Sequence, residues 1–377
     1  MKKRLFKIII LLLFISLSFG LNKSLNIFHG TARAVGDLTV DWGVPEGSPI
    51  FVVNNFAPGD TIQKDVLIIN NADSIRPVGV RGIETELEKN ISEKLLIKIF
   101  SGSDVYYGGT GNEKTLSRFF GESSGPDGIT LFNLSGETDK VLTFEVTFDP
   151  SADNDFQDAR VVFDLRIGIA INIPVECQGL VFADDPIFGT AGNDGLRGTN
   201  KNDLIYAFEG DDKVQSSNGN DCVIGGTGND DINNSNGNDF IFGNEGNDNL
   251  NGSNGNDSIW GGTGNDKLSG SNGSDFLKGE EGDDNLDGSN GNDNIMGGEG
   301  IDTITSSNGS DFVDGGKGND KIDGGNNVDN LFGSEGNDII SGGNGNDSID
   351  GGDGTDSLNG NLGSDVCSGE SEISCEL

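Results

Sequence analysis

Histidine is almost missing from this sequence: His29, near the N-terminus, is the single histidine among 377 residues. Histidine-based zinc sites, Ser-His-Asp triads and Cys-His dyads all need this side chain as a ligand or as a base. If a leader is removed after Ala34, the mature chain contains none. The sequence therefore argues against those hydrolase classes, whereas an enzyme that uses a pair of carboxylates stays chemically allowed.

Hydrophobic and basic residues are also scarce. Only 33% of the residues are hydrophobic and 61 are glycine, too little apolar material for one large core and too much glycine for long helices. The 24 basic residues are outnumbered by 62 acidic ones, and the net charge is −38. Such a chain repels nucleic acid and anionic lipid, so cations are its natural partners.

A long, largely apolar run occurs only once, at Ile8 to Phe19, and its 12 residues are too few to span a bilayer. Four basic residues precede it: Lys2, Lys3, Arg4 and Lys7. Residues 1–34 therefore resemble a secretory signal cleaved after Ala32-Arg33-Ala34, with Ser16-Leu17-Ser18 as the competing site and an uncleaved anchor as the less favoured alternative. We expect a secreted protein, extracellular or at the cell surface, with no membrane span in the mature chain.

Four cysteines in an exported chain predict two disulfide bonds. Cys367 and Cys375 are close enough in sequence for a small clip, which leaves Cys177 to pair with Cys222. The spacing alone does not prove this pairing.

Residues 35–176 alternate between apolar and polar side chains with a period of two. The alternation is clearest in two sets: Leu142, Phe144, Val146 and Phe148, and Val161, Phe163, Leu165, Ile167 and Ile169. Turns are indicated at 58–60, 108–109 and 125–128. This pattern is typical of half-buried strands, so it predicts an antiparallel β-sandwich with no helix beyond a turn or two near 84–94.

Two segments of this module resemble the camelysin and TasA-like family. They are 51–60, FVVNNFAPGD, followed by a strand that ends Ile69-Asn70-Asn71, and 146–157, VTFDPSADNDFQ. The resemblance implies a jelly-roll-like sandwich of the kind found in secreted matrix and fibre proteins. Some members carry a metalloprotease label, but the chain has no HExxH, and we assign Asn154 and Gln157 to turn structure rather than to catalysis.

From Gly189 to Ser368 the sequence divides into 20 nonapeptides without a gap. Position four is glycine except at Lys201 and Asn327, and position eight is apolar from Leu196 to Cys367. Position six is aspartate in every unit: Asp194, Asp203, Asp212, Asp221, Asp230, Asp239, Asp248, Asp257, Asp266, Asp275, Asp284, Asp293, Asp302, Asp311, Asp320, Asp329, Asp338, Asp347, Asp356 and Asp365.

This pattern resembles the RTX, or haemolysin-type, calcium-binding repeat. The resemblance implies a parallel β-roll with two nonapeptides per coil and several Ca²⁺ ions, roughly one per repeat. The aspartates would supply charge, and glycines at positions one and four would adopt positive φ, so that backbone carbonyls converge on the ion. The carbonyls expected to take part lie near Gly192, Gly228, Gly246, Gly264, Gly282, Gly300, Gly318, Gly336 and Gly354. A metal-free solenoid is disfavoured because stacked carboxylates repel one another.

The repeats alternate with a period of 18 residues, so the two sheets of the roll should have different outer surfaces. The outward positions of one sheet are largely apolar and form an expected contact flank: Tyr206, Ile224, Phe240, Phe242, Trp260, Phe276, Met296, Phe312 and Phe332. Such a strip is larger than soluble monomers usually expose. We expect it to contact either the sandwich or a second rod.

The ends of the array carry a finer resemblance to repeat proteins of this kind. Cys177 in a linker at 177–188 would pair with Cys222 in an early repeat, and Cys367 with Cys375 would close a cap at 369–377.

Together these features predict an all-β, secreted, calcium-binding protein that is not an enzyme and serves as a structural, adhesive, matrix or surface-layer component. The alternatives are a secreted hydrolase with a carboxylate-based site in the N-terminal module, and an ice-binding roll, which the lack of an outward threonine file disfavours.

Overall fold

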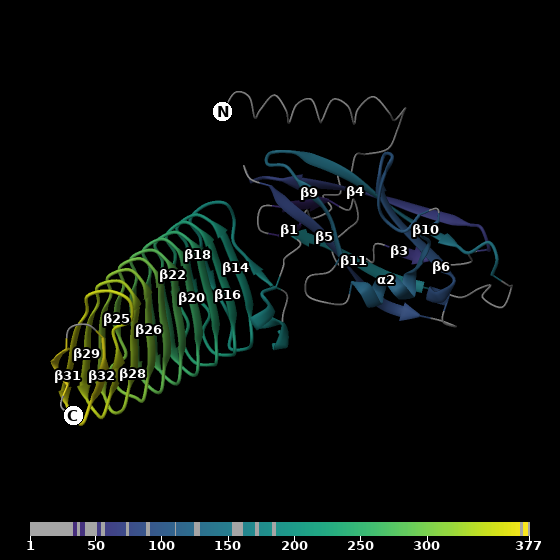
Figure 1. The fold of residues 1–377 in the computed structure, drawn as a ribbon. Coiled ribbons are helices and arrows are strands. Elements are labelled where there is room, and N and C mark those ends of the chain that lie inside the picture. Colours follow the sequence, from purple (N-terminus) through teal and green to yellow (C-terminus); the bar gives the residue numbers. More distant parts are fainter. Residues whose placement is uncertain are drawn as a thin grey trace.

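The computed structural model describes residues 33–35, 38–41, 51–53, 57–72, 75–87, 91–109, 111–123, 129–152, 161–169, 173–182, 186–369 and 372–375, some of them by their backbone only. Nearly all of the expected leader, as well as Asn154 and Gln157, lies outside these residues. The described chain forms an antiparallel sandwich followed by a parallel β-roll (Figure 1). In the part of the chain described, no helix is long and apolar enough to cross a membrane.

The N-terminal module consists of two antiparallel sheets. The larger has the order β1-β2-β4-β10-β6-β7, with β8 also paired to β6, and the smaller has the order β3-β11-β5-β9. Their strands are β1 (Arg33–Val35), β2 (Leu38–Asp41), β3 (Phe51–Val53), β4 (Thr61–Asn70), β5 (Arg76–Leu87), β6 (Leu95–Ser101), β7 (Asp104–Tyr107), β8 (Lys114–Thr115), β9 (Ile129–Leu134), β10 (Asp139–Phe148) and β11 (Val161–Ile169).

One hydrophobic core joins the two sheets, as the alternating pattern predicts. In β10 the side chains of Leu142, Phe144, Val146 and Phe148 are all completely buried. Between them, Thr143 and Glu145 point outward and hydrogen-bond to Asp65 and Gln63 on the neighbouring strand β4. The predicted antiparallel sandwich is therefore confirmed.

The expected helical turn near 84–94 is present, but a second helical segment was not predicted from the sequence. Residues 84–94 contribute the end of β5 and a 3-10 turn, η1 (Ile91–Glu93), whereas a short helix, α2, occupies Leu116–Glu122. Phe119 of α2 is buried against β5, where a Cβ on Gly82 would lie 2.6 Å from the rings of Phe119 and Phe120. The position of this helix is set by its tertiary packing, for which Gly82 leaves space. The sequence pattern did not predict the helix because a segment of two turns has too little hydrophobic periodicity.

The C-terminal module is a roll of two parallel sheets, each with eleven strands. The first roll sheet contains β12 (Ile187–Phe188), β14 (Leu204–Glu209), β16 (Cys222–Thr227), β18 (Phe240–Glu245), β20 (Ser258–Thr263), β22 (Phe276–Glu281), β24 (Asn294–Glu299), β26 (Phe312–Lys317), β28 (Asn330–Glu335), β30 (Ser348–Asp350) and β32 (Val366–Ser368). The second contains β13 (Gly195–Arg197), β15 (Lys213–Gln215), β17 (Asp231–Asn233), β19 (Asn249–Asn254), β21 (Lys267–Asn272), β23 (Asn285–Asn290), β25 (Thr303–Thr305), β27 (Lys321–Asn326), β29 (Ile339–Asn344), β31 (Ser357–Leu362) and β33 (Glu372–Ser374).

Neighbouring strands of each roll sheet pair residues 18 apart, such as Ile205 with Val223, so two nonapeptides make one coil. The position-eight side chains from Ile205 to Leu358 are buried between the sheets and form the roll's own core. The roll extends one strand beyond the expected boundary at each end. β12 precedes Gly189, and β33 pairs with β31, so the described tail lengthens the second sheet rather than folding across the open end.

The sandwich and the roll share a continuous contact. The hydrophobic cluster of the sandwich extends through Ile173 and Cys177 to Leu204, Tyr206 and Cys222 on the first coils of the roll. Cys177 lies in a 3-10 turn, η3 (Val175–Gly179), and is disulfide-bonded to Cys222. Figure 1 shows the sandwich beside the end of the roll that carries β14 and β16.

Candidate calcium sites

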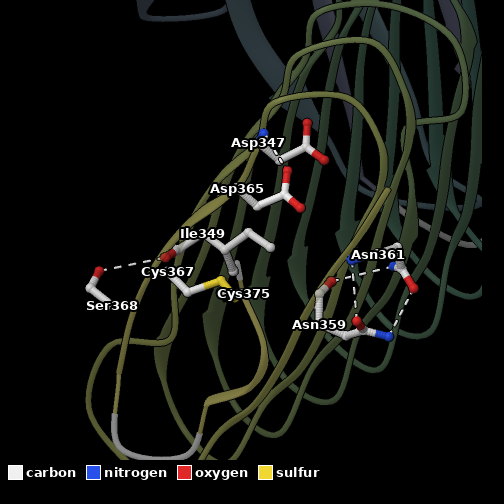
Figure 2. The surroundings of a disulfide bond; sticks show 8 residues. All are labelled: Asp347, Ile349, Asn359, Asn361, Asp365, Cys367, Ser368 and Cys375. Atoms are coloured by element: carbon white, nitrogen blue, oxygen red, sulfur yellow. Dashed lines mark hydrogen bonds between the residues drawn. A yellow bond between two sulfur atoms is a disulfide. The ribbon is translucent and has the colours of Figure 1, made fainter. Parts of the chain in front are cut away.

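The position-six aspartates form two files along the edges of the roll, because each strand begins directly after its aspartate. From Asp212 onward, one carboxylate oxygen of each side chain, Oδ1, accepts a hydrogen bond from the backbone N–H of the aspartate one coil earlier. Asp212 donates in this way to Asp230 at 2.9 Å, and Asp221 to Asp239 at 2.7 Å. The pattern continues to Asp365 at the C-terminal end, where Figure 2 shows it beside Asp347.

The other carboxylate oxygen, Oδ2, is buried and has no hydrogen-bond partner in every position-six aspartate from Asp212 to Asp356. Burial is the largest cause of a raised pKa along both files, and neighbouring carboxylates often add to it. The pKa of Asp239 rises to about 8 and that of Asp248 to about 7. A buried, unpaired carboxylate oxygen is costly, and its repetition at one position indicates a place built for a cation.

Position-one glycines lie against these unpaired oxygens. An ideal Cβ built on Gly225 would lie 2.4 Å from Asp230 Oδ2 and 2.9 Å from the carbonyl oxygen of Gly243 in the next coil. The same arrangement recurs at Gly243, Gly261 and Gly279. Glycine therefore leaves open a space where a carboxylate oxygen and a backbone carbonyl converge.

The expectation of positive φ at position one was wrong. Positive φ occurs at position four, as expected, for example at Gly228, and also at position two, for example at Gly226, whereas Gly225 lies outside that region. Glycine is favoured at position one because a Cβ would occupy the space beside Oδ2, and not because of the backbone conformation. The frequent glycine at position one is visible in the sequence, but the sequence alone does not show whether glycine is needed for space or for positive φ.

The position-four carbonyls, expected near Gly192, Gly228, Gly246 and their equivalents, stack along the roll. The carbonyl oxygen of Gly228 lies 1.7 Å from the ideal Cβ position of Gly246, one coil later. The nearest carboxylate oxygen at such glycines is Oδ1, as between Gly336 and Asp338. The carbonyls that face Oδ2 belong to position-one glycines, and sequence reasoning did not single these out.

The donor set fits calcium. It consists of hard oxygens only, carboxylates and backbone carbonyls, which Ca²⁺ prefers and which suit zinc poorly. No group of three or more His, Cys, Asp or Glu side chains that could hold a metal occurs among the described residues. Backbone carbonyls must therefore complete any site, and the aspartates would supply the charge that neutralises the ion.

The contact flank lies on the outer face of the first roll sheet, as the 18-residue period predicts. Tyr206 is buried under the N-terminal module, and Ile224, Phe240 and Phe242 are partly buried in the same cluster. Phe242 stacks on Trp260 with ring centroids 4.6 Å apart. Farther along the roll, Phe276 contacts Trp260 and Phe312 contacts Phe332, while Phe312 stays exposed and Met296 half-buried.

The second disulfide joins Cys367 of β32 to Cys375, directly after β33, and so links the last strands of the two roll sheets (Figure 2). Cys367 stands at position eight and packs against the core. In this place the disulfide occupies the last layer of the core, where other coils have an apolar side chain.

The family model for the RTX calcium-binding nonapeptide repeat matches residues 188–223 and then, in overlapping copies, the whole array to residue 367. No curated protein matches the chain significantly. The matched residues are those that form the roll, with its two aspartate files and glycine turns. The C-terminal module of this chain is thus a calcium-binding β-roll that belongs to the RTX nonapeptide-repeat family.

Proposed function

We propose that this chain is an extracellular, calcium-loaded structural or adhesive protein, whose roll folds when it meets millimolar calcium. The observation that carries the proposal is the pair of files of buried, unpaired Oδ2 oxygens. Without a counterion these carboxylates would resist burial, so ion binding supplies the free energy that folds the roll. Because many weak sites would bind calcium together, the roll would stay unfolded in the calcium-poor cytosol and fold in the calcium-rich exterior.

Two features support a location outside the cell. The structure pairs its four cysteines in two disulfides, which persist mainly in oxidising compartments. The charged and apolar residues between Lys2 and Phe19 have the composition of a secretory signal. A test compares the culture medium with the cell lysate when the full chain is expressed, with Lys2, Lys3 and Arg4 intact or replaced by glutamate. Retention of both forms in the cell would contradict secretion.

A non-enzymatic role is supported by the lack of histidine after His29 and by the use of the aspartate files in the fold. A rigid rod with a partly apolar flank suits a matrix or surface-layer component. Screening the purified protein against protease, esterase and glycan substrates tests this directly. Turnover that survives in calcium and disappears on mutation of a sandwich carboxylate would overturn the non-enzymatic assignment.

A further inference from the structure

Three repeats carry a polar side chain at position one, directly after strands β15, β17 and β25 of the second roll sheet, where most repeats carry glycine. These residues are Ser216, Asn234 and Ser306. Ser216 and Asn234 belong to neighbouring coils near the sandwich, whereas Ser306 stands alone five coils from Ser216 along the same file. All three side chains are buried.

Any side chain at this position begins beside the unpaired carboxylate oxygen. In the same file, the ideal Cβ positions of Gly252 and Gly270 lie 2.3 Å from the Oδ2 atoms of Asp257 and Asp275. The Ser306 hydroxyl shows how far such a side chain reaches, since it donates a hydrogen bond of 2.7 Å to the carbonyl oxygen of Gly324 in the next coil. A polar group at position one thus enters the space between carboxylate and carbonyl.

Ser216 and Asn234 differ from Ser306 because they find no such partner. The hydroxyl of Ser216 and both amide atoms of Asn234 are buried without a hydrogen bond of good geometry, although each side chain lies close enough to the carboxylate of its own repeat, Asp221 or Asp239, to oppose the rise in the pKa of that group. The Oδ2 atoms of Asp221 and Asp239, the position-six aspartates of these two repeats, are likewise buried without such a hydrogen bond. The two coils are held together by the hydrogen bond from the Asp221 N–H to Asp239 Oδ1, at 2.7 Å.

Four unpaired side-chain oxygens are therefore gathered in two adjacent coils. Burying an amide with both of its polar atoms unsatisfied costs several kcal/mol, roughly, and glycine at the same position would avoid that cost. Amide and hydroxyl oxygens are hard ligands of the kind that Ca²⁺ accepts beside carboxylates. A cation in this place would satisfy the oxygens of both coils at once.

We propose that Ser216 Oγ and Asn234 Oδ1, together with the carboxylates of Asp221 and Asp239, form a calcium site distinct from the glycine repeats and tighter than they are. The proposal rests on the calcium-dependent function above. The extra side-chain ligands raise the affinity because they replace water or longer contacts around the ion. Cys222 directly follows Asp221, so the site lies at the end of the roll that the disulfide ties to η3. It would load first and start folding of the roll from the sandwich end.

The test is a calcium titration of the full mature chain by calorimetry in competition with a chelator. The parent should show one tight class of site beside the many weak ones. Asn234→Gly and Ser216→Gly install the residue that other repeats carry, and each should weaken the tight class by roughly tenfold or more while the weak class is unchanged. Ser306→Gly is the matched control, because its hydroxyl already has a partner, and it should leave the tight class intact.

Asn234→Asp separates the proposed ligand from its main alternative. If the amide oxygen binds the ion, the aspartate keeps an oxygen there and the tight class is retained or strengthened. If the amide N–H instead pairs with Asp239 and replaces the ion, this variant loses its donor, and Asn234→Gly would create a calcium site rather than remove one. That result, or a parent titration with a single weak class, overturns the proposal. A parent that binds no calcium would refute the proposed function itself.

Discussion

The backbone N–H of Asp239 donates a hydrogen bond of 2.8 Å to Oδ1 of Asp257, one coil further along the roll. Asp239 is thus a donor to the next coil, while its own carboxylate accepts from Asp221 in the coil before. An aspartate such as Asp239 therefore links two neighbouring coils, one through its backbone N–H and the other through Oδ1, while its Oδ2 has no hydrogen-bond partner and stays available for the proposed ion. If Oδ2 binds the ion as proposed, calcium binding and coil stacking depend on the same side chain, and folding of the array should be cooperative.

Replacing Asp257 and Asp275 with asparagine should raise the calcium concentration needed to fold the roll. Both carboxylates are buried with an unpaired Oδ2, and an amide supplies less charge to the ion. The matched control is Asp231→Asn with Asp323→Asn, which removes the same charge from exposed outward positions. Circular dichroism during a calcium titration should show a higher midpoint for the first pair alone. Equal midpoints would indicate that the files do not bind the ion.

The roll without calcium should be more structured at pH 5 than at pH 8. Burial raises the pKa of Asp239 to about 8 and that of Asp248 to about 7, whereas an unfolded aspartate titrates near pH 4, roughly. As pH rises from about 4, the unfolded chain ionises first, so the metal-free fold loses stability until its own aspartates ionise between about 6 and 8. Circular dichroism in excess chelator measures this. In millimolar calcium the roll should stay folded at pH 8, and a metal-free signal that grows with pH would contradict the argument.

Arg76→Ala should loosen the sandwich from the roll. The buried Arg76 pairs with both carboxylate oxygens of Glu209 and lies over the Phe208 ring, 4.7 Å from its centroid. Losing these contacts should cost about 1–3 kcal/mol. Thermal unfolding and limited proteolysis between the modules, in calcium, measure the loss. The control is Arg118→Ala, which removes an exposed, solvent-screened ion pair with Glu122 and should leave the stability almost unchanged.

Peptide mapping without reduction should identify Cys177–Cys222 and Cys367–Cys375. The first bond spans 45 residues and the second spans 8, so the loop-entropy argument gives about 4 and about 2.5 kcal/mol. Cys177→Ser with Cys222→Ser should therefore lower the melting temperature more than Cys367→Ser with Cys375→Ser. Crossed pairing, or the opposite order of melting temperatures, would count against this assignment.

The triple substitution Phe242→Ser, Trp260→Ser and Phe276→Ser should keep calcium-dependent folding, because no position-six or position-eight residue changes. Phe242 belongs to the cluster that joins the sandwich to the roll, and both phenylalanines contact Trp260. X-ray scattering in calcium should therefore show looser docking of the sandwich or loss of self-association. Identical mass and shape for variant and parent would mean that the flank is only exposed surface.

The sequence by itself determined the architecture of the roll. A strict nine-residue period with Asp194 to Asp365 at position six, and apolar residues at position eight, admits one arrangement, because each repeat contacts only its neighbours. Strand alternation likewise predicted the sandwich, since period two is a local property of the chain. The 18-residue period of the aromatic residues predicted that the two outer faces of the roll differ.

Only the tertiary structure decided which oxygens converge beside the position-one glycines and how the modules meet. Arg76 and Glu209 are 133 residues apart, and no local pattern relates them. Glycine at position one leaves space beside the aspartate carboxylate and does not serve to adopt positive φ. Only the packing of Gly225 against Asp230 reveals this. The unpaired oxygens of Ser216 and Asn234 became visible in the same way, because hydrogen-bond satisfaction depends on the coil above and not on the repeat itself.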